Sequence, residues 1–263
     1  MVASRIDPAF ASAFDGAALV FARLFEQMIR IAQPVEDRPF PFGVWQHFPT
    51  GRKKSDFTDE FYVLQGDPEA KLAAMQAADT GPKLYFDVIG VDPGQDDSVY
   101  TAAGFRCDWV EILMDRPVTS ADADRPVDPR IVRILDAGQI ERLALVWTGG
   151  RAPNGYQPIV DGHNTAPELV QALIEIDGET AAYGRAIVSG KDAFISDVNA
   201  FPGFRRRGLG EAVMNALHTG IAEQGAERVV LTSTQMGIPL YQKLGYRTHA
   251  EVWIYEPVDD NGS

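Results

Sequence analysis

Apolar side chains recur along the chain with two periods, one of three to four residues and one of two. The longer period is typical of helices and the shorter one of strands. Pro34 ends the first helical run, while Asp67 and Pro68 suit the N-cap and first position of the second. The first half is thus predicted to hold helices at 14–31, 68–77 and 97–103 and strands at 40–48, 57–64, 84–89 and 109–114.

The second half has a clearer order. Asp177-Gly178 is a hairpin signal between two strand-like runs, and Gly225 is a natural end for the longest helix. The order predicts an α+β fold, in which an antiparallel meander is followed by a βαβ crossover. The predicted strands are 131–134, 169–176, 180–188, 193–199, 228–232 and 252–255, and the predicted helices are 140–147, 209–225 and 238–244.

A stretch rich in proline and acid lies between the halves, at residues 117–129, and has little to bury. It suggests domains at 1–118 and 130–263, joined by a linker at 119–129. An internal echo supports two related halves, because Val99–Arg106 resembles Leu240–Arg247, and both follow one apolar strand and precede another.

Composition narrows the possible functions. The 263 residues carry a net charge of −13, which disfavours nucleic acid and anionic membranes and favours a cationic or amine-bearing partner. No apolar run is long enough to span a bilayer, and no export signal is evident, so a cytoplasmic location is expected. The four histidines lack metal-ligand spacing, and no base lies near Cys107 to activate its thiol, so neither metal nor thiol chemistry is expected.

The chemically most informative stretch is Ile195–Gly210, where a strand-like run ends at Ala200. Three arginines then precede Gly208-Leu209-Gly210 and a long amphipathic helix. Unobstructed N–H groups at a helix start, the helix dipole and nearby cations together form an anion site. In an acidic chain this predicts a phosphate-bearing small ligand, although a solvated basic face is the alternative for the arginines.

These residues fit the pattern Arg/Gln-x-x-Gly-x-Gly/Ala, and Leu-Tyr-x-x-x-Gly-aromatic follows at Leu240–Tyr246. The combination resembles the GNAT N-acetyltransferase superfamily over residues 131–257. The resemblance implies a GNAT-like acyltransferase fold, in tandem with a degenerate N-terminal copy. It also implies acetyl-CoA as co-substrate, with no metal. The implied coenzyme A contacts are Val198, Asn199 and Ala200 for the pantetheine arm, Arg205, Arg206, Arg207, Gly208, Leu209 and Gly210 for the pyrophosphate, and Thr234.

The resemblance also suggests two catalytic groups. Tyr241 matches the tyrosine that acts as general acid on the departing thiolate in this family, with packing under the co-substrate as the alternative. Asp197 is the only carboxylate near the expected opening of the sheet, and Ser196 occupies a position where some members carry a glutamate. It is a candidate base for the acceptor amine, although it could also bind the amine, relay a proton through water or cap a turn.

The corresponding turn of the first half has the opposite charge. Asp67 and Glu69 put negative charge where a pyrophosphate would need cations, and Pro68 removes an amide donor. We therefore expect that the first half does not bind coenzyme A in this way, and that it shapes the acceptor pocket or stabilises the second half.

The leading hypothesis is an N-acetyltransferase in which a primary amine attacks the thioester directly in a ternary complex. The acceptor is a small-molecule or peptide amine, and the loop at 149–156 is expected to contribute to its choice. A homodimer is possible. The alternatives are a non-catalytic coenzyme A-binding or regulatory module and a dinucleotide-dependent oxidoreductase, the latter disfavoured by the hairpin series before the glycine turn.

Overall fold

The computed structural model describes residues 16–30, 34–49, 58–64, 66–80, 84–90, 93–147 and 166–258. In the first half, Asp67 caps a helix as predicted, because its carboxylate accepts the backbone N–H groups of Glu69 and Ala70. The elements are α2 (Gly16–Arg30), β1 (Glu36–Arg38), β2 (Gly43–His47), β3 (Asp59–Leu64), α3 (Pro68–Ala77), β4 (Leu84–Gly90), a 3-10 turn (Pro93–Asp96), α4 (Asp97–Ala102) and β5 (Phe105–Pro117).

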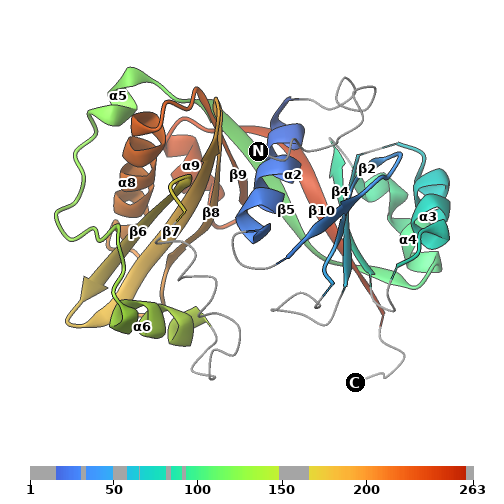
Figure 1. Ribbon diagram of the computed structural model, residues 1–263, viewed down its shortest axis with the longest axis horizontal. Coiled ribbons are helices and arrows are strands. Elements are labelled where there is room, and N and C mark those ends of the chain that lie inside the picture. The colour runs from blue at the N-terminus through green and yellow to red at the C-terminus, as the bar shows by residue number, and fades with distance from the viewer. Residues whose placement is uncertain are drawn as a thin grey trace.

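The second half follows the predicted order, a three-stranded meander and then a parallel crossover. Its elements are α5 (Ser120–Ala123), α6 (Ala137–Trp147), β6 (Leu169–Ile176), β7 (Glu179–Ser189), β8 (Asp192–Ala200), α8 (Leu209–Glu223), β9 (Arg228–Ser233), α9 (Ile238–Lys243) and β10 (Arg247–Pro257). From β1 to β5 and from β6 to β10 the sheet-forming segments repeat one order, which is three strands, helix, strand, helix, strand (Figure 1).

One predicted strand, at 131–134, is wrong. Within it the structure has a single bridge, in which Val132 and Leu173 exchange backbone hydrogen bonds. The chain turns immediately before, because the Asp128 carboxylate accepts the Arg130 N–H and its carbonyl accepts the Ile131 N–H. These local bonds compete with a continuous ladder.

The described strands form one mixed sheet in the order β1-β2-β3-β4-β10-β5-β9-β8-β7-β6. The two halves exchange their last strands within it, because β10 pairs with β4 of the first half and β5 pairs with β9 of the second. β5 and β10 also pair with each other, and at the centre Glu111 lies opposite Val252. Each strand runs well beyond the predicted length, because it crosses from one half to the other (Figure 1).

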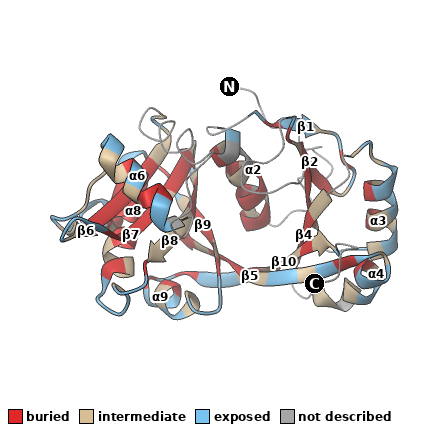
Figure 2. Ribbon diagram, turned by 90° about the horizontal axis from the view of Figure 1, so that it is seen from below, coloured by how far each residue is buried: buried red, intermediate tan, exposed pale blue. Residues whose placement is uncertain are grey.

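The sheet is bent, and helices cover both of its faces. Helices α8 and α9 pack on one face of the second half, and α3 and α4 pack on the same face of the first half. Figure 2 shows α2 on the inner face, between the two ends of the sheet. There it buries Phe21 and Leu24 against strands from both halves, including Tyr62 and Phe194. This inner face therefore joins the halves through one apolar cluster.

The stretch predicted as a linker is packed against the second half. It contains α5, which contacts α8, and the Asp122 side chain in α5 is fully buried. The predicted domain limits remain a prediction. Among the described helices, none is long and apolar enough to cross a membrane.

Candidate functional site

The strand before the glycine turn leaves one of its neighbours halfway along. β8 pairs with β9 only from Asp192 to Ile195, whereas its pairing with β7 continues to Ala200. A bulge opposite Gly184 accompanies this divergence, and Asp197 within it has a left-handed φ of 57°. The edge of β8 that faces the opening, residues 196–200, is thus free of β9. It includes the residues predicted to hold the pantetheine arm.

The turn that follows leads these residues into the start of α8. Gly208, the N-cap, has a φ of 75°, where a side chain would be strained, and no side-chain cap is described there. The first N–H groups of α8 therefore remain open to a ligand. The three arginines are exposed but differ in their contacts. The Arg205 Nε donates to the Ala200 carbonyl oxygen at 3.0 Å, and the Arg207 guanidinium lies 5.4 Å from the Phe204 ring centre.

The first half is closed at the equivalent place. β3 and β4 remain paired over all six residues of β3, from Asp59 to Leu64, so these strands do not diverge. Lys71 from α3 is buried there, and its Nζ donates to the Leu64 carbonyl oxygen at 2.9 Å. Asp67 already accepts N–H groups at the start of α3. Among the described residues, the first half thus lacks the strand divergence and the uncapped helix start of the second.

Tyr241 lies in α9, next to the opening of the sheet. Its side chain is 7% exposed, and its ring packs edge-on against Tyr246 at 5.8 Å. Gly237 makes room for it, since a Cβ at that position would come within 2.8 Å of the Tyr241 ring. Burial, reinforced by the charge of Glu111, raises the pKa of Tyr241 to about 12. The phenol therefore stays protonated at neutral pH and can serve as a hydrogen-bond donor.

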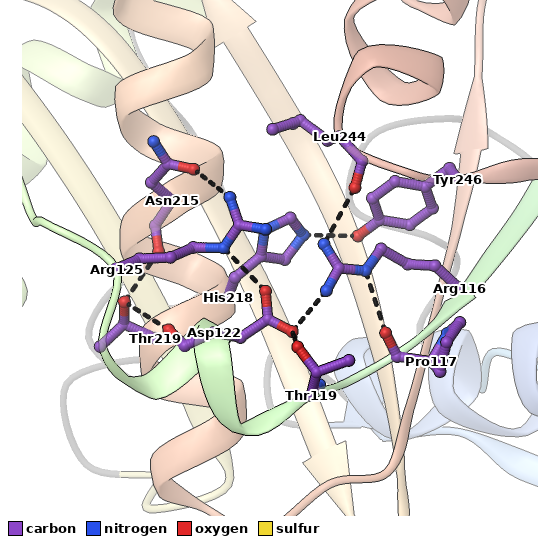
Figure 3. Close-up of polar contacts among 10 residues, drawn as sticks. All are labelled: Arg116, Pro117, Thr119, Asp122, Arg125, Asn215, His218, Thr219, Leu244 and Tyr246. Carbon is purple, nitrogen blue, oxygen red and sulfur yellow. Dashed lines mark hydrogen bonds and ion pairs between the residues drawn. The ribbon is translucent and has the colours of Figure 1, made fainter.

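A buried polar network supports the ring on which Tyr241 packs (Figure 3). The Tyr246 hydroxyl lies 2.8 Å from the His218 Nε2 in α8. Nearby, Arg116 at the end of β5 donates to the Leu244 carbonyl oxygen and pairs with Asp122 of α5. Arg125 bridges Asp122 to Asn215 of α8. The network thereby connects α5, α8 and the α9–β10 turn through hydrogen bonds and ion pairs.

Three of these groups have displaced pKa values, and burial raises the pKa of Tyr246 well above its usual value. Burial alone would raise the pKa of Asp122, but hydrogen bonds from Thr119, Arg116 and Arg125 outweigh it and hold the pKa at about 2. Burial lowers the pKa of His218 to about 3, and the charge of Arg116 acts in the same direction. The network therefore holds an ionised aspartate beside a neutral histidine.

Asp197, the base predicted from the sequence, is ion-paired. Its carboxylate lies 2.5 Å from a guanidinium nitrogen of Arg185, and that arginine side chain is only 12% exposed. Arg185 comes from β7 and was not predicted as a site residue. A carboxylate held by a buried guanidinium is a weaker proton acceptor than a solvated one. The arrangement fits a role for Asp197 in fixing the bulge.

Glu111 of β5 lies close enough to Asp197 to interact electrostatically with it, and it was not predicted from the sequence. The Thr232 side chain hydrogen-bonds to its carboxylate, and the charge of Asp197 acts on it. Burial is the main cause of its raised pKa. The one signal in the sequence is an acidic residue inside an otherwise apolar run. That signal does not show that a strand from the first half borders the site in the second.

Thr234 and the loop at 149–156 are the remaining residues predicted from the sequence to contribute to the site. Thr234 is exposed at the end of β9, and its carbonyl oxygen accepts the Gly237 N–H at 3.0 Å. A pocket of about 290 Å³ lies between α6 and the turn after β8, lined by Arg142, Leu145, Val146, Gly178, Glu179, Thr180, Phe201, Pro202 and Phe204. The predicted acceptor loop at 149–156 lies outside the described residues.

Cys107 is the one cysteine of the chain. Burial, with the charges of Asp97 and Asp108, raises the pKa of Cys107 to about 11, so its thiol is protonated at neutral pH. Within the described ranges, no three histidine, cysteine or acidic side chains are grouped so as to hold a metal ion.

Comparison with known proteins identifies the type of domain. Residues 176–254 match the family model of the FR47-like proteins. A glucosamine 6-phosphate N-acetyltransferase of Trypanosoma brucei brucei is 36% identical over 66 residues, which are 25% of this chain and 42% of that protein. The chain thus matches less than half the length of this curated relative.

Solved structures share the fold over nearly the whole chain. A GCN5-related N-acetyltransferase from Kribbella flavida has a TM-score of 0.58 at 17% identity, covering 94% of this chain and 96% of its own. One from Sphaerobacter thermophilus scores 0.51 at 15% identity, with coverages of 91% and 92%. A tandem GNAT protein from the clavulanic acid biosynthesis pathway scores 0.53 at 14% identity, with coverages of 94% and 91%. Residues 176–254 thus match the FR47-like family, and the chain as a whole shares the fold of GNAT acetyltransferases.

Proposed function

We propose that the protein is an N-acyltransferase that transfers an acetyl group from acetyl-CoA to a primary amine. The main support is the free edge of β8, which leads directly into the glycine start of α8. The amide chain of pantetheine would add to residues 198–200 as an extra strand does. The pyrophosphate would accept hydrogen bonds from the amides between Arg206 and Gly210, with positive charge from the exposed arginines.

In this proposal the reaction has no covalent enzyme intermediate. The amine nitrogen attacks the thioester carbonyl carbon, a C–N bond forms, and the C–S bond breaks. Tyr241 donates its proton to the departing sulfur, which its protonated state at neutral pH allows. The amide near Ala200 and Phe201 would polarise the carbonyl oxygen.

The acceptor is proposed only as a class. The net charge of −13 favours an amine that carries positive charge. The curated relative is named for glucosamine 6-phosphate, an amine that also carries a phosphate, so this sugar belongs in any acceptor panel. A cytoplasmic location and a homodimer remain predictions.

Calorimetric titration with acetyl-CoA tests the co-substrate site. The wild type should bind it saturably, and Gly208→Glu combined with Gly210→Glu should abolish binding, because both substitutions put carboxylates at the phosphate position. Gly66→Glu is the matched control, since Gly66 is exposed in the corresponding turn of the first half with open space around its Cβ position. Unchanged binding by the double variant would contradict the proposed site.

Thiol release from acetyl-CoA tests catalysis. The panel contains spermidine, an aminoglycoside, a lysine-containing peptide and glucosamine 6-phosphate. Release with at least one amine supports the transferase. Saturable acetyl-CoA binding without thiol release from any of them would favour the alternative, a non-catalytic coenzyme A-binding module.

A further inference from the structure

We propose that the first half supplies the proton acceptor of the reaction: Glu111 of β5 takes the proton of a cationic amine that enters over Trp109 on the inner face of the sheet. This inference rests on the proposed acyltransferase function and identifies the side from which the acceptor approaches. In this proposal Glu111 takes the role of base that the sequence suggested for Asp197. The exchanged strand β5 thereby brings a catalytic residue of the first half to the site in the second.

The pairing of the strands places Glu111 beside the opening. β5 lies next to β9, with Ile112 opposite Ser233, and β9 is the strand from which β8 diverges. Ile112 packs into the cluster under α8, whereas Leu113 packs into the cluster around α2. Because side chains alternate along a strand, Glu111 points to the inner face with Leu113. There it receives the hydrogen bond from Thr232.

The titratable groups that interact electrostatically with Glu111 are Asp197 of β8 and Tyr241 of α9. Asp197 of β8 acts on it from across the opening and is itself paired with Arg185 of β7. Tyr241 of α9 is close enough for the charge of Glu111 to contribute to its raised pKa. Helix α2 brings Arg23 and Arg30 to the inner face, and they pair with Asp192 and Asp37 respectively.

Glu111 and Tyr241 therefore lie within electrostatic range of each other, one as a potential proton acceptor and the other as a potential proton donor. Burial disfavours the charged form of the Glu111 carboxylate and keeps the Tyr241 phenol protonated. A carboxylate whose pKa is raised by burial is a better proton acceptor than an ordinary glutamate, and a protonated phenol is a donor. Pairs of groups with displaced pKa values in one site are typical of acid–base catalysis.

The protons balance across the proposed step. An ammonium acceptor loses two protons when it becomes an amide. Glu111 takes the first, which frees the nitrogen lone pair for attack, and later releases it to solvent. The second replaces the proton that Tyr241 gave to the thiolate. The products are the amide, the free thiol of coenzyme A and one released proton.

Trp109 indicates the class of acceptor. It lies two residues before Glu111 in β5, so its side chain is on the same face, and it is 56% exposed. An exposed indole next to a carboxylate suits an alkylammonium group, which the ring face and the negative charge both attract. We therefore expect amines with at least one further cationic group, such as spermidine, to be preferred over neutral primary amines.

Kinetics of Glu111→Gln test the proton transfer. The substitution should lower kcat about 10²- to 10⁴-fold for the best amine of the panel and remove the fall of activity at low pH. Its affinity for acetyl-CoA should be unchanged in calorimetry. Asp108→Asn is the matched control, because Asp108 is an exposed carboxylate of the same strand and should keep both rate and pH profile. If Glu111→Gln retains the wild-type rate and pH profile, the assignment is overturned.

A second measurement does not depend on the acceptor. In protein labelled with carboxyl-¹³C glutamate, the resonance missing from Glu111→Gln reports the titration of Glu111. Its midpoint should lie above about 4.3, the ordinary value for glutamate. A midpoint at or below that value overturns the assignment, whatever the kinetics show.

Trp109→Ala tests the entry side. It should raise KM for spermidine more than it changes kcat, whereas Trp109→Phe should retain most of the affinity. An unchanged KM for Trp109→Ala overturns this part of the proposal. These outcomes differ from failure of the proposed function itself, which would show as absent acetyl-CoA binding or absent thiol release by the wild type.

Discussion

At the scale of single residues, the site depends on groups whose protonation is set by burial. Tyr241 keeps its proton because its phenol is buried near a carboxylate, and Gly237 gives its ring room. Asp197 is the candidate base predicted from the sequence, and in the structure it is paired with Arg185. The residue that matters for proton transfer in our proposal, Glu111, comes from a strand that is distant along the chain.

Tyr241→Phe tests the proposed general acid. Removing the hydroxyl should lower kcat by about 10²-fold, because the thiolate loses its proton donor, while acetyl-CoA binding stays unchanged. Tyr100→Phe is the matched control, since Tyr100 is the counterpart of Tyr241 in the internal echo. Among the described residues, no partner hydrogen-bonds to the Tyr100 hydroxyl. Equal effects of the two substitutions on kcat would refute the role of Tyr241.

Among the secondary-structure elements, α5 links the end of β5 to α8 in the second half. It is only four residues long, so it is too short to be a stable helix by itself. Asp122 holds it in place, because its buried carboxylate pairs with Arg116 of β5 and Arg125 beyond α5 (Figure 3). The predicted linker therefore contains a short helix that packs on the second half.

Asp122→Ala should destabilise the protein by about 3–5 kcal/mol, because it leaves the buried Arg116 guanidinium without its counter-charge. Urea unfolding at pH 7 measures the change. Asp124→Ala removes an exposed carboxylate two residues away and should change the free energy of unfolding by less than about 0.5 kcal/mol. Similar midpoints for the two variants would show that the buried network does not hold α5.

At the scale of the whole molecule, the exchange of β5 and β10 makes each half depend on the other. β5 lies between β9 and β10, so the sheet of the second half continues through a strand of the first. The inner apolar cluster around α2 also draws on both halves. Folding is thus expected to involve both halves together, whatever the exact domain limits.

Expression of residues 130–263 alone tests this dependence. The fragment lacks β5 and α2, which leaves the β9 edge unpaired and the inner face uncovered, so we expect it to aggregate or unfold. Co-expression with residues 1–129 should restore a soluble complex that binds acetyl-CoA. A monomeric fragment that unfolds cooperatively without its partner would contradict the expectation.

The network in Figure 3 also predicts acid sensitivity of the whole fold. The pKa of His218 is about 3 in the folded protein and about 6.5 when unfolded, so below pH 6.5 the unfolded state binds more protons. Its contribution to stability is full above pH 6.5 and falls by up to about 1.4 kcal/mol per pH unit toward pH 3. Urea midpoints at pH 7.0 and 4.5 measure the fall, and His218→Gln should reduce it. If the urea midpoint of His218→Gln falls by the same amount as that of the wild type, other titratable groups cause the acid sensitivity.

Much of the fold and part of the site could be predicted from the sequence because their signals are local. The capped start of α3, the Asp177-Gly178 hairpin and the glycine start of α8 each depend on residues within one turn of the chain. The same holds for the position of Tyr241 in its motif. Boundaries were less accurate where pairing decides them, as at 131–134 and in the two exchanged strands.

Local signals in the sequence predict the order of elements in the second half, the candidate anion-binding turn and the opposite charge of the corresponding turn in the first half. Local periods, caps and charges are sufficient for these features. Tertiary contacts were needed to place β5 beside β9, Asp197 against Arg185 and Glu111 within hydrogen-bond reach of Thr232. The physical reason is that the choice among strand partners depends on backbone hydrogen bonds and burial between distant segments, which no local pattern specifies.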